Sequence, residues 1–157
     1  MNLHRRSADK KNDHQNGFSL IELVIVLSIT PLLLLITLNL FNDYQANSQL
    51  NIAHQEMRQA LTDARMKAVT GINGSRHGVY TDAVAGTFTV FEGTTYASRN
   101  QMNDIVYTWN PGFVTYAGLA EIHFSKLRGT TSPATITLTN TANNQQIIQI
   151  NEAGSLQ

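Results

Sequence analysis

The chain has 157 residues, of which 42% are hydrophobic and 14% are charged, with 11 basic and 11 acidic residues. This length allows one compact domain and an anchor, and excludes an architecture of several domains. The absence of cysteine excludes disulfides, so the folded part must be stabilised by its own packing.

Charge is distributed unevenly between the N-terminal leader and the rest of the chain. Before Phe18, four basic residues accompany two acidic ones, whereas from Phe18 onward seven basic residues accompany nine acidic ones. A positive flank before an apolar segment favours retention of the N-terminus in the cytoplasm and export of the remainder. We therefore predict a cytoplasmic leader peptide at residues 1–17 and an extracytoplasmic C-terminal domain.

An apolar segment follows the leader. Residues 18–41 read FSLIELVIVLSITPLLLLITLNLF, and these 24 residues would extend about 36 Å as a helix. Since a bilayer core is about 30 Å thick, the segment predicts one tilted transmembrane helix. A cleaved secretory signal is disfavoured, because its apolar region is only about 7–15 residues long and residues 42–45 offer no small-residue cleavage site. A buried soluble helix is disfavoured because the segment has no polar face.

Two residues interrupt this apolar pattern. Glu22 is the only charged residue of the segment, and a lone carboxylate there is costly. It either lies close enough to the headgroups to be tolerated or pairs with a cation of a neighbouring copy. Pro31 removes the backbone donor to the carbonyl of Leu27, which predicts a weakened or kinked helix. The hydroxyls of Ser28 and Thr30 offer replacement donors, and the kink is either tolerated or a flexible point used in assembly.

The run Gly17-Phe18-Ser19-Leu20-Ile21-Glu22-Leu23-Val24 resembles the class III signal of type IV prepilins and type II secretion pseudopilins. The resemblance covers about residues 12–45. It implies that a prepilin peptidase cleaves between Gly17 and Phe18 and then methylates the new amino group of Phe18. It also implies that Glu22 is the assembly glutamate, which pairs with the N-terminus of an adjacent subunit.

Two positions depart from that family's pattern. The leader of 17 residues is longer than in many members. The later proline of the mature helix is replaced by Asn39, whereas Pro31 matches the earlier one.

The amphipathic pattern of residues 42–70 predicts a continuation of the same helix. Apolar residues recur at steps of three and four: Leu50, Ala53, Met57, Ala60 or Leu61, Ala64 and Ala68. Because alanines dominate this stripe, we expect it to form the core of a packed domain rather than a coiled-coil seam. Gly71 and Gly74 are expected to end the helix.

From about Arg76 the apolar period changes to two, which predicts short strands. The predicted strands are Gly78–Tyr80, Thr87–Glu92, Asp104–Trp109, Phe113–Tyr116, Glu121–Phe124, Ala134–Thr139 and Gln146–Asn151, the last two joined as a hairpin. The predicted fold class is α+β. A long N-terminal helix, transmembrane at 18–41 and amphipathic at 42–70, packs on a small antiparallel β-sheet or sandwich at 71–157.

The order of helix and strands is similar to that of H-type minor pseudopilins, related minor pilins and competence pseudopilins. The similar segments are Ile122–Phe124 through Gly129, Ala134–Thr139, and Ile148 through Gly154. Some minor pilins of this group bind DNA through a basic C-terminal tail. Residues 151–157 contain no lysine or arginine, which disfavours the same activity here.

The remaining polar residues form no pattern typical of an active site. His54, His77 and His123 lack paired spacing, so no metal site is expected. The hydroxyls of 130–132 have no nucleophile motif around them. Lys126, Arg128, Arg76 and Arg99 would form a basic patch only if folding gathered them. We predict no catalytic residue, no cofactor and no enzymatic activity.

The sequence therefore predicts a minor pilin or pseudopilin of a type IV pilus, type II secretion pseudopilus or competence pseudopilus. The expected location is the inner membrane, with a single pass, and then the filament. Expected partners are the prepilin peptidase, other pilins or pseudopilins bound through the N-terminal helix, and the inner-membrane assembly platform. DNA is not expected. Two alternatives stay open: an uncleaved single-pass protein with an extracytoplasmic β binding domain, and a pilus-tip DNA receptor using Lys126 and Arg128.

Overall fold

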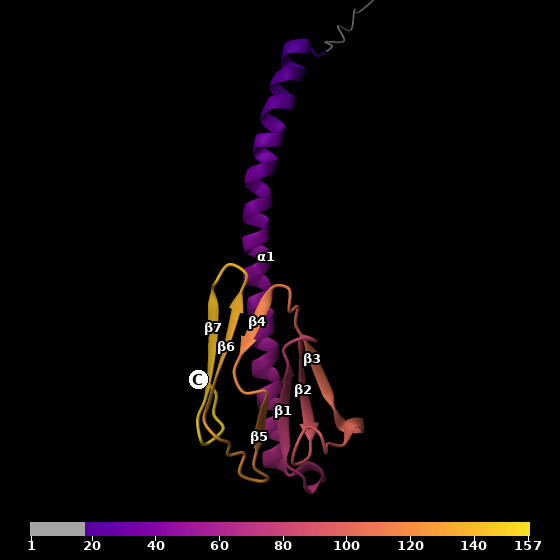
Figure 1. Cartoon of the computed structure of the whole chain (residues 1–157), viewed down its shortest axis with the longest axis vertical. Coiled ribbons are helices and arrows are strands. Elements are labelled where there is room, and N and C mark those ends of the chain that lie inside the picture. Colours follow the sequence, from indigo (N-terminus) through magenta and orange to yellow (C-terminus); the bar gives the residue numbers. More distant parts are fainter. Residues whose placement is uncertain (1–17) are drawn as a thin grey trace, which may run out of the picture. The chain divides into compact units, whose positions relative to one another are not determined.

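A computed structural model describes residues 18–157, except the side chains of 36–40, and Gly17 with the predicted leader lies outside it. The chain divides into two compact units, one ending at Asn39 and the other comprising Leu40–Gln157. Helix α1, Leu20–Thr70, supplies residues to both units (Figure 1). Each unit is described by itself.

The first unit is the N-terminal part of α1. The helix continues through Pro31. Ser28 Oγ donates to the Val24 carbonyl and Thr30 Oγ1 to the Val26 carbonyl, both at 2.7 Å. The expectation that these hydroxyls bond the Leu27 carbonyl was wrong, because each reaches back four residues to its own turn. Within the described residues, no helix has both the length and the apolarity needed to cross a membrane.

The second unit contains the predicted apolar stripe of α1. The members of this stripe are at most 3% exposed: Leu50, Ala53, Met57, Ala60, Leu61, Ala64 and Ala68. Ala46, which is also buried, extends the stripe by one turn towards the N-terminus. The helix ends at Thr70, and Gly71 adopts a left-handed φ of 67°, which favours glycine. The predicted core stripe and helix end are confirmed.

All seven predicted strands are present, with their ends within two residues of the prediction. They are β1 (His77–Asp82), β2 (Thr87–Glu92), β3 (Ile105–Thr108), β4 (Val114–Ala117), β5 (Glu121–Phe124), β6 (Ala134–Asn140) and β7 (Gln145–Ile150). They form two antiparallel sheets, of order β3-β2-β1-β5 and β4-β6-β7. The β6–β7 hairpin has the predicted turn and pairs Ile136 with Ile148.

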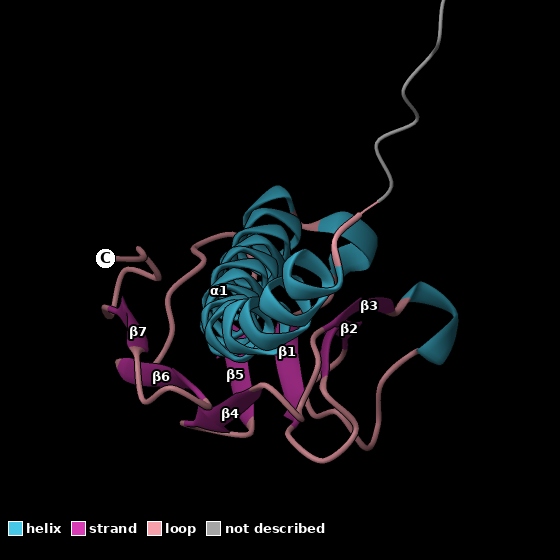
Figure 2. Ribbon diagram, turned by 90° about the horizontal axis from the view of Figure 1, so that it is seen from above, coloured by secondary structure: helices cyan, strands magenta, loops and turns pink. Residues whose placement is uncertain are grey.

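The two sheets do not form a sandwich. They lie side by side in an arc around one side of α1 (Figure 2), and both contribute to a core shared with the helix. The first sheet contributes Phe88 and Phe124 to this core, among others, and the second contributes Ile136 and Ile148. The alanine stripe explains the arrangement, because small side chains let both sheets approach the helix. The α+β prediction is confirmed in its form of a helix packed on sheets.

Polar side chains attach the sheets to α1. Asn47 Oδ1 accepts hydrogen bonds from Asn140 Nδ2 at 2.9 Å and Asn144 Nδ2 at 2.8 Å, which fixes the β6–β7 turn to the helix. The Tyr107 hydroxyl donates to Asp63 and fixes β3. Burial and this carboxylate raise the pKa of Tyr107 to about 12. These bonds satisfy polar groups that would otherwise oppose docking of the strands.

The C-terminal segment closes the outer edge of β7. Gln149 and Gln157 exchange backbone hydrogen bonds at 3.2 and 2.9 Å, and Asn151 N–H donates to the Ser155 carbonyl at 3.1 Å. Gly154 makes the turn with a φ of 72°, and a Cβ there would overlap the carbonyl oxygen of Gly129. Arg65 of α1 lies against both glycines and donates to the Ala153 carbonyl.

Candidate functional site

The start of α1 carries the residues that the resemblance singled out. Phe18 is 85% exposed, and Glu22 lies in the first turn of the helix, where the helix dipole favours a negative charge. Phe18 and Glu22 line one groove of about 220 Å³ with Leu23, Val26 and Leu27. Among the described residues, no hydrogen bond or ion pair engages the Glu22 carboxylate.

Apolar side chains surround this carboxylate along the first unit. Each large hydrophobic residue of 18–35 is at least half exposed: Phe18, Leu20, Ile21, Leu23, Val24, Ile25, Val26, Leu27, Ile29, Leu32, Leu33, Leu34 and Leu35. An exposed apolar surface of this extent is typical of a site that binds protein or lipid. Pro31 lies in the middle of it. The first unit thus presents an apolar helix with one carboxylate at its start.

The three histidines lie on different elements, and the predicted basic patch loses Arg99. His54 lies on α1, His77 on β1 and His123 on β5, and no group of residues in the described part of the chain has the composition of a metal site. Arg99 is withdrawn from the patch, since its Nε lies 2.7 Å from Asp104 Oδ2 and its guanidinium stacks on Tyr96.

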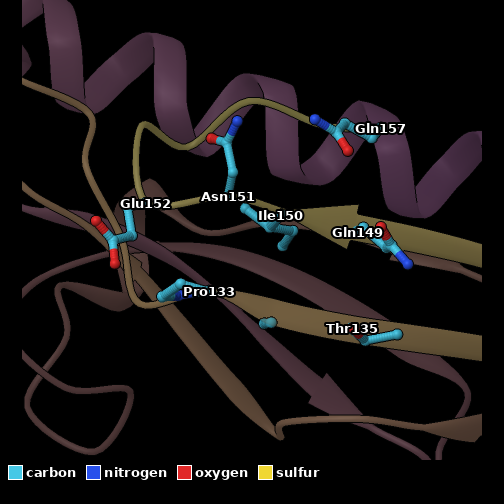
Figure 3. Close-up of a pocket in the computed structure, with 8 residues that line it drawn as sticks. Pro133, Thr135, Gln149, Ile150, Asn151, Glu152 and Gln157 are labelled. Carbon is cyan, nitrogen blue, oxygen red and sulfur yellow. The ribbon is translucent and has the colours of Figure 1, made fainter.

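A pocket of about 460 Å³ with several polar side chains lies over the start of β6, the end of β7 and the C-terminal segment. Figure 3 shows the side chains of Glu152, Asn151, Gln149 and Gln157 pointing in different directions over an open surface. They do not converge on a common point, so this pocket lacks the arrangement that acid–base or nucleophilic chemistry requires.

A buried carboxylate joins two loops, and the sequence analysis did not identify it. Glu92, 8% exposed, accepts hydrogen bonds at Oε2 from Asn73 Nδ2 at 2.7 Å and Asn103 Nδ2 at 2.6 Å. These bonds, that of Asn73 foremost, hold the pKa of Glu92 below its usual value of 4.5. Burial is the main cause that lowers the pKa of the adjacent His77, and the negative charge of Glu92 partly opposes this shift. No spacing rule in the sequence brings Asn73, Glu92 and Asn103 together.

Acid should therefore destabilise the chain in two steps. The pKa values of His77 and Glu92 are lower in the folded state than in the unfolded state. As the pH falls, the unfolded state therefore takes up protons first, and the free energy of unfolding decreases. The loss should begin as pH falls through 6.5, where His77 and His54, whose pKa is also lowered by burial, take up protons in the unfolded state only. It should continue below 4.5, where the same holds for Glu92. Thermal unfolding followed by circular dichroism across this range measures it. Glu92→Gln should flatten the lower step and enlarge the upper one, because it removes the charge that opposes the lowering of the His77 pKa. An unchanged lower step contradicts the assignment.

A helix packed in an arc of two antiparallel sheets and preceded by an apolar helical segment defines the α+β class predicted above. Residues 12–38 match the family model described as the prokaryotic N-terminal methylation motif. A solved structure, the minor pseudopilin EpsH from the Type 2 Secretion System of Vibrio cholerae, has the same fold. The TM-score is 0.52 and the identity 19%, over 69% of this chain and 94% of that chain. No curated protein matches.

The motif and the fold confirm the resemblance to type IV pilins and pseudopilins. The motif ends within the first unit, whereas the fold match covers 69% of the chain and therefore extends into the second unit.

Proposed function

We propose that this chain is a minor pilin or pseudopilin that is cleaved between Gly17 and Phe18, methylated at Phe18 and assembled into a filament through α1. The carrying observation is the Glu22 carboxylate, which has no partner among residues 18–157 and lies beside Phe18 at the start of an exposed apolar helix. Cleavage would place a new amino group one helical turn from this carboxylate. An anion and a cation at one end of an apolar helix would each seek a partner, and a neighbouring copy supplies both.

Residues 18–41 are proposed as the segment that lies first in the inner membrane and then in the filament. The positive leader keeps the N-terminus cytoplasmic, and the domain at 71–157 with the helix at 42–70 is extracytoplasmic. The proposed partners are the prepilin peptidase, other pilins or pseudopilins, and the membrane assembly platform. Among the three machines considered, the fold shared with EpsH favours a type II secretion pseudopilus.

The mature N-terminus tests the proposal. The full chain is expressed with and without an active prepilin peptidase, and the N-terminal peptide is read by mass spectrometry. We expect the product to begin at methylated Phe18 only when the peptidase is active. A chain that keeps residues 1–17 beside an active peptidase would instead be the uncleaved single-pass alternative.

Replacing the assembly glutamate should separate cleavage from assembly. Glu22→Ala removes the proposed partner of a neighbour's amino group, but it leaves Gly17 and Phe18 in place. We expect the mature N-terminus to be unchanged and incorporation into sheared filaments, read by immunoblot, to fall about tenfold or more, the loss typical of one charged hydrogen bond. Glu56→Ala, on the domain part of α1, is the control. Normal incorporation of the Glu22 variant would refute this role.

A further inference from the structure

A second pocket, of about 280 Å³, lies between the start of β1 and the β5–β6 turn. Its polar lining consists of Arg76, His123, Ser125, Thr130, Thr131 and Ser132. We propose that this pocket binds a phosphate group, either as inorganic phosphate or as the terminal phosphate of a small ester. The inference does not depend on cleavage or assembly of the chain.

The lining supplies hydrogen-bond donors and contains no carboxylate. Among the described residues, no hydrogen bond or ion pair occupies the Arg76 guanidinium, and the residue is exposed. A planar guanidinium binds two oxygens of one phosphate in a fixed fork. The positive charge of the guanidinium also disfavours a metal cation at the same place.

The hydroxyl groups opposite Arg76 are held by the turn. Ser125 Oγ lies 2.6 Å from Thr130 Oγ1 and accepts from the Thr130 backbone N–H at 3.0 Å. The backbone closes the same turn, since Ser125 N–H donates to the Thr130 carbonyl at 2.8 Å. The turn is further anchored by Leu127, whose N–H donates to the Ala68 carbonyl at the end of α1. A site whose donors are positioned in advance loses less entropy when an anion binds.

Local charge also favours an anion. Lys126 and Arg128 belong to the same turn, and Lys126 Nζ lies near Gly74, two residues before Arg76. The nearby acid Glu121 is already engaged, with Oε1 accepting from Tyr96 N–H at 2.6 Å and lying 3.1 Å from His123 Nε2. His123 Nδ1 is buried without a partner. The pocket, of about 280 Å³, has room for one terminal phosphate, and the DNA duplex in the test below distinguishes this ligand from a polymer.

Nuclear magnetic resonance of the full chain in detergent micelles tests the proposal. Inorganic phosphate, glucose 6-phosphate, glucose and a short DNA duplex are titrated separately at constant ionic strength. We expect saturable shifts at Arg76 and at residues 125–132 with the first two ligands and none with glucose. The tighter of the two phosphates identifies the source.

Arg76→Gln should weaken binding about tenfold or more, the loss expected for one charged hydrogen bond. Arg58→Gln, on α1 outside the pocket, should not weaken it. The spectrum of the Arg76 variant establishes that the domain is folded. The proposal is overturned if neither phosphate gives saturable shifts, if Arg58→Gln weakens binding as much as Arg76→Gln, or if DNA binds more tightly per phosphate than the small ligands.

Discussion

Replacing Gly17 by valine should leave the leader on essentially every chain, even beside an active prepilin peptidase. Glycine has no Cβ, so the backbone on both sides of the proposed scissile bond can approach catalytic groups closely. Valine places a branched side chain at that point. The chain should keep its positive leader, gain no methylated Phe18 and fail to enter filaments. An immunoblot that resolves the two lengths, with mass spectrometry of the N-terminal peptide, measures the result.

Asn16→Val is the matched control, because it introduces the same side chain one residue earlier and leaves the Gly17–Phe18 pair intact. We expect this variant to be cleaved. Equal cleavage of both variants would mean that the peptidase does not read Gly17. Equal failure of both would mean that bulk anywhere in the leader blocks entry, and the prediction specific to Gly17 would then be wrong.

The second large effect is expected at Gly154, where alanine should destabilise the domain by about 3 kcal/mol. A Cβ would overlap the Gly129 carbonyl oxygen and crowd Arg65, and overpacking of this kind costs about 1–3 kcal/mol. The left-handed φ of 72° adds about 1 kcal/mol for any residue with a Cβ. Urea unfolding of the full chain in detergent, followed by tryptophan fluorescence, measures the difference.

Gly74→Ala separates the two contributions. Gly74 has nearly the same φ, 65°, but the nearest atom to its missing Cβ is Lys126 Nζ at 3.5 Å, an ordinary contact with a flexible side chain. It should cost only the conformational share, about 1 kcal/mol. Equal losses in the two variants would show that backbone conformation, rather than the contact with Gly129, determines the requirement for glycine at 154.

Local periodicity was sufficient to predict the helix and the strands. The stripe from Leu50 to Ala68 follows the helical repeat, and its members are buried. The alternation of Ile136 and Leu138 with threonines likewise predicted β6 and its buried face. These patterns depend on neighbours within a few residues, which a single sequence displays directly.

Contacts between distant residues were not predictable in the same way. Asn47 binds Asn140 across 93 positions, and Glu92 joins Asn73 to Asn103, although neither set has a recognisable spacing. The division into two sheets depends on which strands pair. The alternation of apolar and polar residues along a strand does not reveal its partner, because it would be the same with any partner. The phosphate pocket similarly requires Arg76 to meet a turn some fifty residues later. In the groove at the start of α1, the sequence alone could link Phe18 and Glu22, because they lie within one short motif.

The closed edge of β7 bears on how such a chain avoids unwanted association. An exposed strand edge accepts any extended chain, and pairing there is open-ended. In this domain Ser155 and Gln157 occupy the backbone groups of Asn151 and Gln149, so a foreign strand finds the C-terminal end of that edge already filled. In the proposed filament, this part of the edge would not pair with a neighbour's strand, and association would be left to the helix.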